Sequence, residues 1–374
     1  MDFAKSDIQT MILDSAERLL AETSGVEYWR EQRHQPFGFD ESRWAQFAEL
    51  GWLALPLPEA AGGLGGSVID VALLNVALGK ALATEPYVTV VLAAHVLGQA
   101  TDSAKAGELL GELAAGSLRI ALAHREQGDD PLVTTSRATI ARADGDGYVL
   151  DGAKILAADV AGASRLIVSA RIDGDEGAAL FLVPADAAGV TIDDYPLIDG
   201  TRSADIRFER VALARDALIV GANHCAEILN EAIDRASVAL MAQAVGAMEA
   251  SVKICGAYAA ERRQFGQPIG QFQSIQHILA DIFVAAHQAR SMLYHALANF
   301  DAPAADRGAA LSAARIVIGE AGQTVSRQGI QVHGGYGLTD EYAISHYFRR
   351  LLSLEKQNGD LIGHTTRFGD MIFA

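Results

Sequence analysis

Residues 261–266 read Glu-Arg-Arg-Gln-Phe-Gly and residues 331–337 read Gln-Val-His-Gly-Gly-Tyr-Gly, with Gln273 and Gln276 between the two motifs. Arginine presents a planar fork of N–H donors that matches the oxygens of a phosphate. Two adjacent glycines let backbone N–H groups come close to a bulky anion. The cation, the side-chain amides and the glycine turn therefore predict a cradle for a diphosphate.

The hydrophobic spacing places both motifs in helices and in a turn between helices, not directly after a strand. A Rossmann loop and a P-loop both begin at the end of a strand, so the sequence excludes both. A helical segment that binds a diphosphate in another way indicates a flavin nucleotide or coenzyme A as the ligand.

Helical periodicity covers the two ends of the chain, and short β-rich runs fill the middle. Runs at 138–143 and 148–152 flank the turn sequence Asp-Gly-Asp-Gly, which predicts a β-hairpin. Several strands without helices between them indicate a small antiparallel sheet or barrel. The further strands that we expect lie at 166–170, 179–183 and 205–208.

Four long periodic segments with short connections follow the β-rich region and predict a helical bundle. They cover residues 228–263, 271–299, 309–332 and 342–364. We therefore expect three domains, mostly α with a β middle. These are an N-terminal helical domain (1–118), a middle β domain (119–222) and a C-terminal four-helix bundle (223–374).

The charge balance narrows the range of partners. The chain has a formal net charge of -17 and half of its residues are hydrophobic. Such an acidic protein repels nucleic acid and anionic membrane surfaces, so we expect neither as a partner. Acidic residues in the first 20 positions argue against a signal peptide, and the apolar stretch at 88–97 is too short to span a bilayer. These features predict a soluble cytoplasmic protein.

The chain has no pattern that predicts a metal site. Its two cysteines, Cys225 and Cys255, are too few for a disulfide framework or a metal cluster, and they are typical of small core residues in a reducing compartment. No spacing of His, Cys, Asp and Glu resembles a zinc site.

The helix–β–helix order and the motifs at 261–266 and 331–337 together resemble the acyl-CoA dehydrogenase family over nearly the whole chain. The resemblance implies FAD as cofactor, an acyl-CoA as substrate and an electron-transfer flavoprotein or similar acceptor. In that family these motifs hold the diphosphate and adenosine end of an FAD that belongs to a neighbouring subunit, which requires at least a dimer. The residues that the resemblance assigns to this cradle are Arg262, Phe265, Gln273, Gln331, Val332, His333, Gly334 and Gly335.

The reaction of that family removes the α-hydrogen as a proton and the β-hydrogen as a hydride, so a carboxylate base is required. The resemblance places this base at Asn358, or in some relatives at Ala236, and neither side chain accepts a proton at neutral pH. Asp360 and Glu355 are the nearest acids that substitute for it, although each is also typical of a solvated surface acid. Weaker candidates are Asp234 and Glu231.

The region that resembles the flavin-ring pocket of the family is also altered. Leu156 stands where relatives have a tryptophan, and Ala158 where they have a threonine. Of the Thr-Glu-Pro turn of the family only the acid, Glu126, is retained. A complete cradle beside an altered ring pocket resembles the small subunits of two-component acyl-CoA dehydrogenases.

Three interpretations follow from these features. The first is an FAD-dependent acyl-CoA dehydrogenase that desaturates an acyl-CoA in lipid degradation, with this chain as one subunit of a homo- or hetero-oligomer. The second is a non-catalytic partner subunit that provides the FAD cradle to a catalytic homologue. The third is an acyl-CoA oxidase-like flavoprotein.

Overall fold

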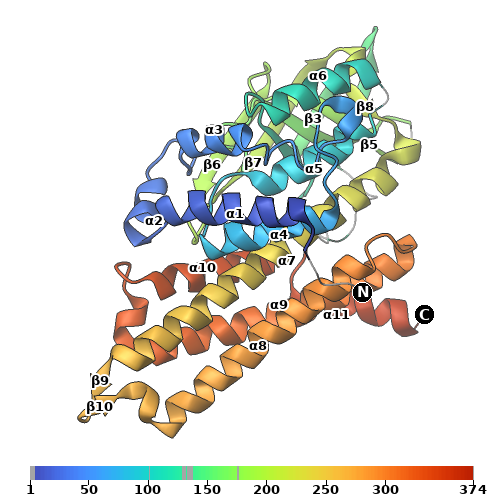
Figure 1. Cartoon of the computed structure of the whole chain (residues 1–374). Coiled ribbons are helices and arrows are strands. Elements are labelled where there is room, and N and C mark those ends of the chain that lie inside the picture. Colours follow the sequence, from blue (N-terminus) through green and yellow to red (C-terminus); the bar gives the residue numbers. More distant parts are fainter. Residues whose placement is uncertain (1–4, 101, 129–131, 133–137, 175–176, 374) are drawn as a thin grey trace. The chain divides into compact units, whose positions relative to one another are not determined.

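The computed structural model describes residues 5–100, 102–128, 132, 138–174 and 177–373. It has helices at both ends of the chain and a sheet in the middle, which confirms the predicted fold class (Figure 1). The chain forms two compact units. The first contains the segments Met1–Glu31, Val68–Ala83 and Ser237–Ala374, and the second contains Gln32–Ser67 and Thr84–Ala236.

The second unit is built around an eight-stranded sheet with the order β6-β7-β3-β2-β4-β5-β8, in which β1 pairs with β4. The predicted hairpin is present as β2 and β3, joined at Asp144 and Gly147. Most pairs are antiparallel, but β1 and β2 both run parallel to β4. The strands are β1 (Ile120–Ala123), β2 (Ile140–Asp144), β3 (Gly147–Ala158), β4 (Arg165–Ile172), β5 (Ala178–Pro184), β6 (Val190–Pro196), β7 (Arg202–Leu213) and β8 (Leu218–Val220).

Alternation of buried and exposed side chains explains why β7 forms a strand with one face on the core. By contrast β5 is buried along almost its whole length, because it lies between two other strands and is covered on both faces. The helices of this unit are α3 (Glu41–Glu49), α5 (Tyr87–Gly98), α6 (Ser103–Ala114) and the first part of α7 (Ala222–Glu261), up to Ala236.

The first unit is helical. Within it α8 and α9 run side by side, and α10 and α11 both pack on α9 (Figure 1). Its helices are α1 (Asp7–Glu22), α2 (Val26–Gln32, all but the last residue), α4 (Val68–Lys80), α7 from Ser237 onward, α8 (Gln273–Ala298), α9 (Ala304–His333), α10 (Ala343–Lys356) and α11 (Leu361–Phe373).

The last predicted helix, 342–364, is wrong as a single element, because the chain breaks into α10 and α11 between Lys356 and Leu361. Gln357 is extended, with ψ 140°, and the next two residues have positive φ, 53° at Asn358 and 93° at Gly359. These conformations end a helix, and glycine adopts the second of them without strain.

The helix α7 is long and apolar enough to cross a membrane by composition alone. However, 72% of its most apolar window is buried inside the protein, so it is the central helix of a folded core. Its close approach to α4 depends on two glycines. A Cβ on Gly246 would lie 2.1 Å from the carbonyl oxygen of Val76, and a Cβ on Gly79 would lie 2.1 Å from that of Gln243.

Because the two backbones touch at this crossing, we expect Gly246→Ala to separate α7 from α4. The strain should exceed the helix-propensity gain of about 1 kcal/mol and lower the free energy of unfolding by about 1–3 kcal/mol. Urea denaturation measures this change. Gly256→Ala on the same helix is the matched control, since a Cβ there meets nothing within 4 Å. Equal effects of the two substitutions would contradict the close crossing.

Candidate functional site

The motif at 261–266 forms an exposed hairpin immediately after α7. Strands β9 (Arg263–Gln264) and β10 (Gln267–Pro268) pair antiparallel, with Phe265 and Gly266 as the two-residue loop. Both loop residues have positive φ, 52° and 82°, which is the backbone of a type I′ turn. Phe265 is 94% exposed in this left-handed conformation. Apart from an edge contact with the ring of Phe272, at a centroid distance of 6.1 Å, this exposed ring contributes little to the stability of its own chain.

The other cradle residues gather at the same end of the helical unit. Arg262 is exposed, and its N–H donates to the carbonyl of Tyr258 at 2.8 Å. Gln273 is exposed at the first turn of α8. Tyr258 on α7 stacks on His333 at the end of α9, with ring centroids 4.2 Å apart, so the ends of α7 and α9 meet.

The glycine turn after α9 is open to solvent. Gly334 has φ 59° and ψ -143°, a conformation available essentially to glycine alone. A Cβ placed on Gly334 or Gly335 meets nothing within 4 Å. Gln331 is exposed beside them, whereas the side chains of Val332 and His333 are buried. The exposed residues therefore fit a diphosphate that approaches from outside, and Val332 and His333 support the turn from inside.

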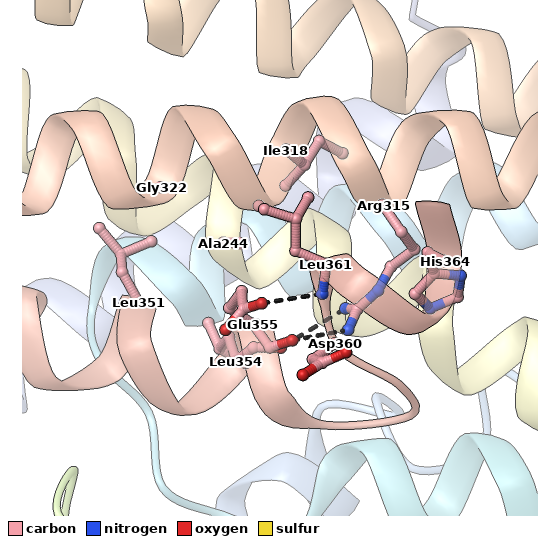
Figure 2. Close-up of a pocket in the computed structure, with 11 residues that line it drawn as sticks. Ala244, Arg315, Ile318, Gly322, Leu351, Leu354, Glu355, Asp360, Leu361 and His364 are labelled. Atoms are coloured by element: carbon pink, nitrogen blue, oxygen red, sulfur yellow. Dashed lines mark hydrogen bonds between the residues drawn. The ribbon is translucent and has the colours of Figure 1, made fainter. Parts of the chain in front are cut away.

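The acids proposed as alternative bases lie on either side of the break between α10 and α11 (Figure 2), Glu355 in the last turn of α10 and Asp360 directly before α11. Glu355 is buried, and its carboxylate accepts from the N–H of Leu361 at 2.9 Å and pairs with Lys356 at 3.0 Å. Asp360 accepts from the N–H of Gly363 at 2.9 Å. That hydrogen bond, opposed by burial and assisted by Lys356, lowers the pKa of Asp360. Both acids thus cap the N-terminus of α11, where free N–H groups attract carboxylates.

Arg315 on α9 holds this turn from inside the protein (Figure 2). Its guanidinium donates to the backbone carbonyls of Leu354 at 3.4 Å, Glu355 at 3.3 Å and Gly359 at 2.8 Å, and also to that of Gln357. Burial lowers the pKa of Arg315 to about 10, against the opposing effect of the Glu355 carboxylate, so it stays charged at neutral pH. Arg315 was not predicted from the sequence, although an arginine followed by Ile-Val-Ile in a predicted helix is a signal of a buried cation.

A small cavity of about 20 Å³ lies beside Arg315, Glu355 and His364. It has room for about one water molecule and not for a substrate. His364 contacts the carbonyl of Asn358 through Nε2 at 3.1 Å. Burial, together with the nearby Arg315, lowers the pKa of His364 to about 4, so its imidazole is neutral and Nε2–H donates to that carbonyl.

Asn358 is partly buried, and its amide lies 3.4 Å from the hydroxyl of Ser237 on α7. Ser237 directly follows Ala236, the other position at which the resemblance placed a base. No carboxylate occupies either position.

Glu126, expected near the flavin, directs its carboxylate into the second unit. It pairs with the fully buried ammonium of Lys154 at 2.5 Å and accepts from the N–H groups of Thr139, at 3.0 Å, and Ala138. Burial raises the pKa of Glu126, but Lys154 and the two N–H groups outweigh this and lower it overall. Any contact of this segment with a cofactor would come from its backbone. Lys154 was missed from the sequence because a lysine in a strand is usually solvated.

The substituted ring-pocket residue Leu156 lies in an irregular part of β3. It has φ 53° and is 45% exposed. Its N–H donates to the carboxylate of Asp205 at 3.0 Å, beside a register shift between β3 and β7. An aliphatic side chain in this place offers contact area but no stacking surface of the kind an indole provides.

Three family models match the chain in order. They describe the N-terminal domain of acyl-CoA dehydrogenases at residues 6–117, the middle domain at 120–211 and the C-terminal domain at 225–360. A probable acyl-CoA dehydrogenase of Bacillus subtilis, YngJ, is 29% identical over 94% of this chain and 93% of its own length.

Two solved structures extend this similarity. The steroid ACAD Tcur3481-Tcur3483 superposes with a TM-score of 0.87 at 28% identity, covering 98% of this chain and 97% of the other. The ChsE4-ChsE5 complex from Mycobacterium tuberculosis superposes with a TM-score of 0.89 at 25% identity, covering 100% of this chain and 99% of the other.

Because Glu126 balances a buried cation, we expect Glu126→Gln to lower the free energy of unfolding by about 3–5 kcal/mol at pH 7. Because the pKa of Glu126 is lower in the folded protein than its ordinary value, its carboxylate stabilises the fold fully at a pH above that ordinary value. This stabilisation is lost as the pH falls through the pKa that Glu126 has in the folded protein. Urea denaturation at pH 7 and pH 3 measures both effects. Asp216→Asn, which breaks an exposed pair with Lys105, is the control at about 0–1 kcal/mol. A loss no larger than that of the control would refute the structural role.

Proposed function

This chain belongs to the acyl-CoA dehydrogenase family, and from that premise we propose that it is one subunit of an FAD-dependent acyl-CoA dehydrogenase. In this proposal the subunit provides the cradle for the diphosphate of an FAD bound by a related partner chain. The assembly desaturates an acyl-CoA thioester in the cytoplasm and passes the electrons to an electron-transfer flavoprotein or a similar acceptor.

The observation that carries the proposal is the exposure of the cradle in the single chain. Arg262, Gln273, Gln331 and the Gly334-Gly335 turn face solvent at one end of the helical unit. Arg262 would pair with the phosphates, and the amides and the turn would donate to the adenosine end. When bound, FAD supplies the acceptor for the hydride.

The occupied acids support a partner-supplied base. Glu355 and Asp360 serve as caps of α11, and each also contacts Lys356. A carboxylate held in its charged form by N–H donors is a weak proton acceptor. These contacts, together with an amide at 358 and a methyl at 236, favour a subunit that lends its cradle without providing the base.

Two similar structures bear on the type of assembly. One is the ChsE4-ChsE5 complex, and the other is the steroid ACAD Tcur3481-Tcur3483, which is also named for two components. By analogy we propose a hetero-oligomer with a related chain, acting on a bulky acyl-CoA. An acyl-CoA oxidase-like reaction is the alternative, and reduction of oxygen by the assembly would identify it.

Gly335→Val tests the cradle. Apart from the adjacent residues 334 and 336, no described atom lies within 4 Å of the position of the new Cβ, so we expect normal folding of the subunit but at least about a tenfold loss of FAD from the assembly. The flavin absorbance of the chain purified with its partner measures this loss. Gly107→Ala on α6, which also has open space, is the control. Full FAD retention by Gly335→Val would contradict the cradle, and rapid acyl-CoA oxidation by this chain alone would contradict the hetero-oligomer.

Asp360→Asn and Glu355→Gln test the source of the base. Since both acids act as caps, we expect each variant to lower stability while turnover per bound FAD changes by less than about threefold. Loss of an ordinary general base would reduce turnover by about 100-fold or more. Anaerobic reduction of the flavin by an acyl-CoA measures the turnover, and a loss of that size in either variant would place the base in this subunit.

A further inference from the structure

His333 lies at the end of α9 and is only 4% exposed. Its Nδ1 is 2.7 Å from the carbonyl oxygen of Gly329. A carbonyl only accepts hydrogen bonds, so Nδ1 carries the proton and Nε2 is the unprotonated nitrogen. Nε2 is buried and has no hydrogen-bond partner among the described residues. The ring therefore contributes through its faces and not through polar contacts of Nε2.

Those faces join two separate parts of the cradle. One contacts Tyr258 of α7 at a centroid distance of 4.2 Å, and Tyr342 contacts the ring at 4.9 Å. Tyr258 stands one helical turn before Arg262, which donates its N–H to the Tyr258 carbonyl.

The turn that follows His333 is folded back against it. A Cβ on Gly337 would lie only 2.8 Å from the Cβ of His333, and Tyr336 stacks on Tyr342 at 4.6 Å. A displacement of the ring would thus move both the glycine turn and the end of α7.

We propose that His333 is the positioning residue of the cradle, which fixes the Gly334-Gly335 turn relative to Arg262 through the stack with Tyr258 and does so only as the neutral imidazole. The proposal rests on the proposed function for the ligand, but the coupling between the two segments is a property of the chain itself. It gives His333 a role distinct from contact with the ligand.

The surroundings of the ring favour the neutral form. The titratable groups around it are three tyrosines and a thiol, namely Tyr258, Tyr336, Tyr342 and Cys255. The carboxylate nearest to this cluster along α7 is that of Glu261. No carboxylate among the described residues forms an ion pair with His333. Burial lowers the pKa of His333, against a smaller opposing effect of the Gly329 carbonyl. Protonation of His333 therefore costs free energy in the folded protein. As the pH falls below the ordinary pKa of histidine, the contacts of the ring with the two tyrosines become less stable.

Three variants of the full chain separate stacking from simple folding. His333→Ala removes the stack, and His333→Phe keeps an aromatic ring but removes the titration. His287→Ala is the matched control, because His287 also stacks on an aromatic ring, Phe283 at 4.0 Å, and also contacts a carbonyl four residues earlier, but it is exposed on α8. Hydrogen exchange of residues 262–272 and 334–338, without any cofactor, is the readout.

We expect His333→Ala to raise the hydrogen-exchange rate of residues 262–272 by about two- to tenfold at pH 7.5, the effect of losing an aromatic pair. The substitution itself lies in α9, which is remote from these residues in the sequence. His333→Phe and His287→Ala should match the wild type. Between pH 7.5 and 5.5 the wild type should lose protection in both segments, after correction for intrinsic exchange, and His333→Phe should not.

Two results would overturn the proposal. One is an effect of His333→Ala confined to 334–338, and the other is equal acid sensitivity of the wild type and His333→Phe. Retention of FAD by the assembly is measured separately. A wild-type assembly without FAD refutes the proposed function but leaves the exchange result, and hence the coupling, intact.

Discussion

The contact between the buried guanidinium of Arg315 and the carbonyls at the end of α10 determines what the C-terminal part of this protein can do. A helix ends with carbonyl groups that lack partners, and burial makes such groups costly. Arg315 donates to the carbonyls of residues 354 and 355 in the last turn of α10 and to those of 357 and 359 in the turn after it. These hydrogen bonds let the chain turn sharply at Asn358 and start α11. The acids on either side then face the new helix N-terminus and become its caps.

The cradle follows the opposite principle. Its ligand-facing groups are exposed, and one of them, Phe265, sits in a left-handed turn that the chain gains little by forming. Behind them lies an aromatic cluster in which the buried His333 contacts the partly buried Tyr258 and Tyr342. Rigid support behind exposed donors is what the binding of a charged ligand requires, because ordering flexible groups at the moment of binding reduces affinity.

These two regions together explain an uneven division of labour. The residues proposed to hold the cofactor of another chain are exposed at one end of the helical unit, whereas the positions expected to hold a base contain an amide and a methyl group. The carboxylate of Glu126 forms a buried ion pair with Lys154 within the sheet unit. This distribution is the physical basis of the proposal that a related chain completes the reaction.

The sequence by itself determined the order of helical and β regions, the family and the cradle motif, because these depend on local periodicity and on residue types at fixed spacing. It also placed Asn358 and Ala236 at the two positions where the family resemblance expects a base, since these positions follow from counting residues along the chain. Only the tertiary structure decided which groups contact the side chains of Glu355, Asp360, Glu126 and His333. Whether an acid is a base, a cap or half of an ion pair depends on donors from distant segments, as with Arg315, which reaches a carbonyl 42 residues away. Such long-range contacts depend on how the helices and strands pack, and no local sequence pattern predicts them.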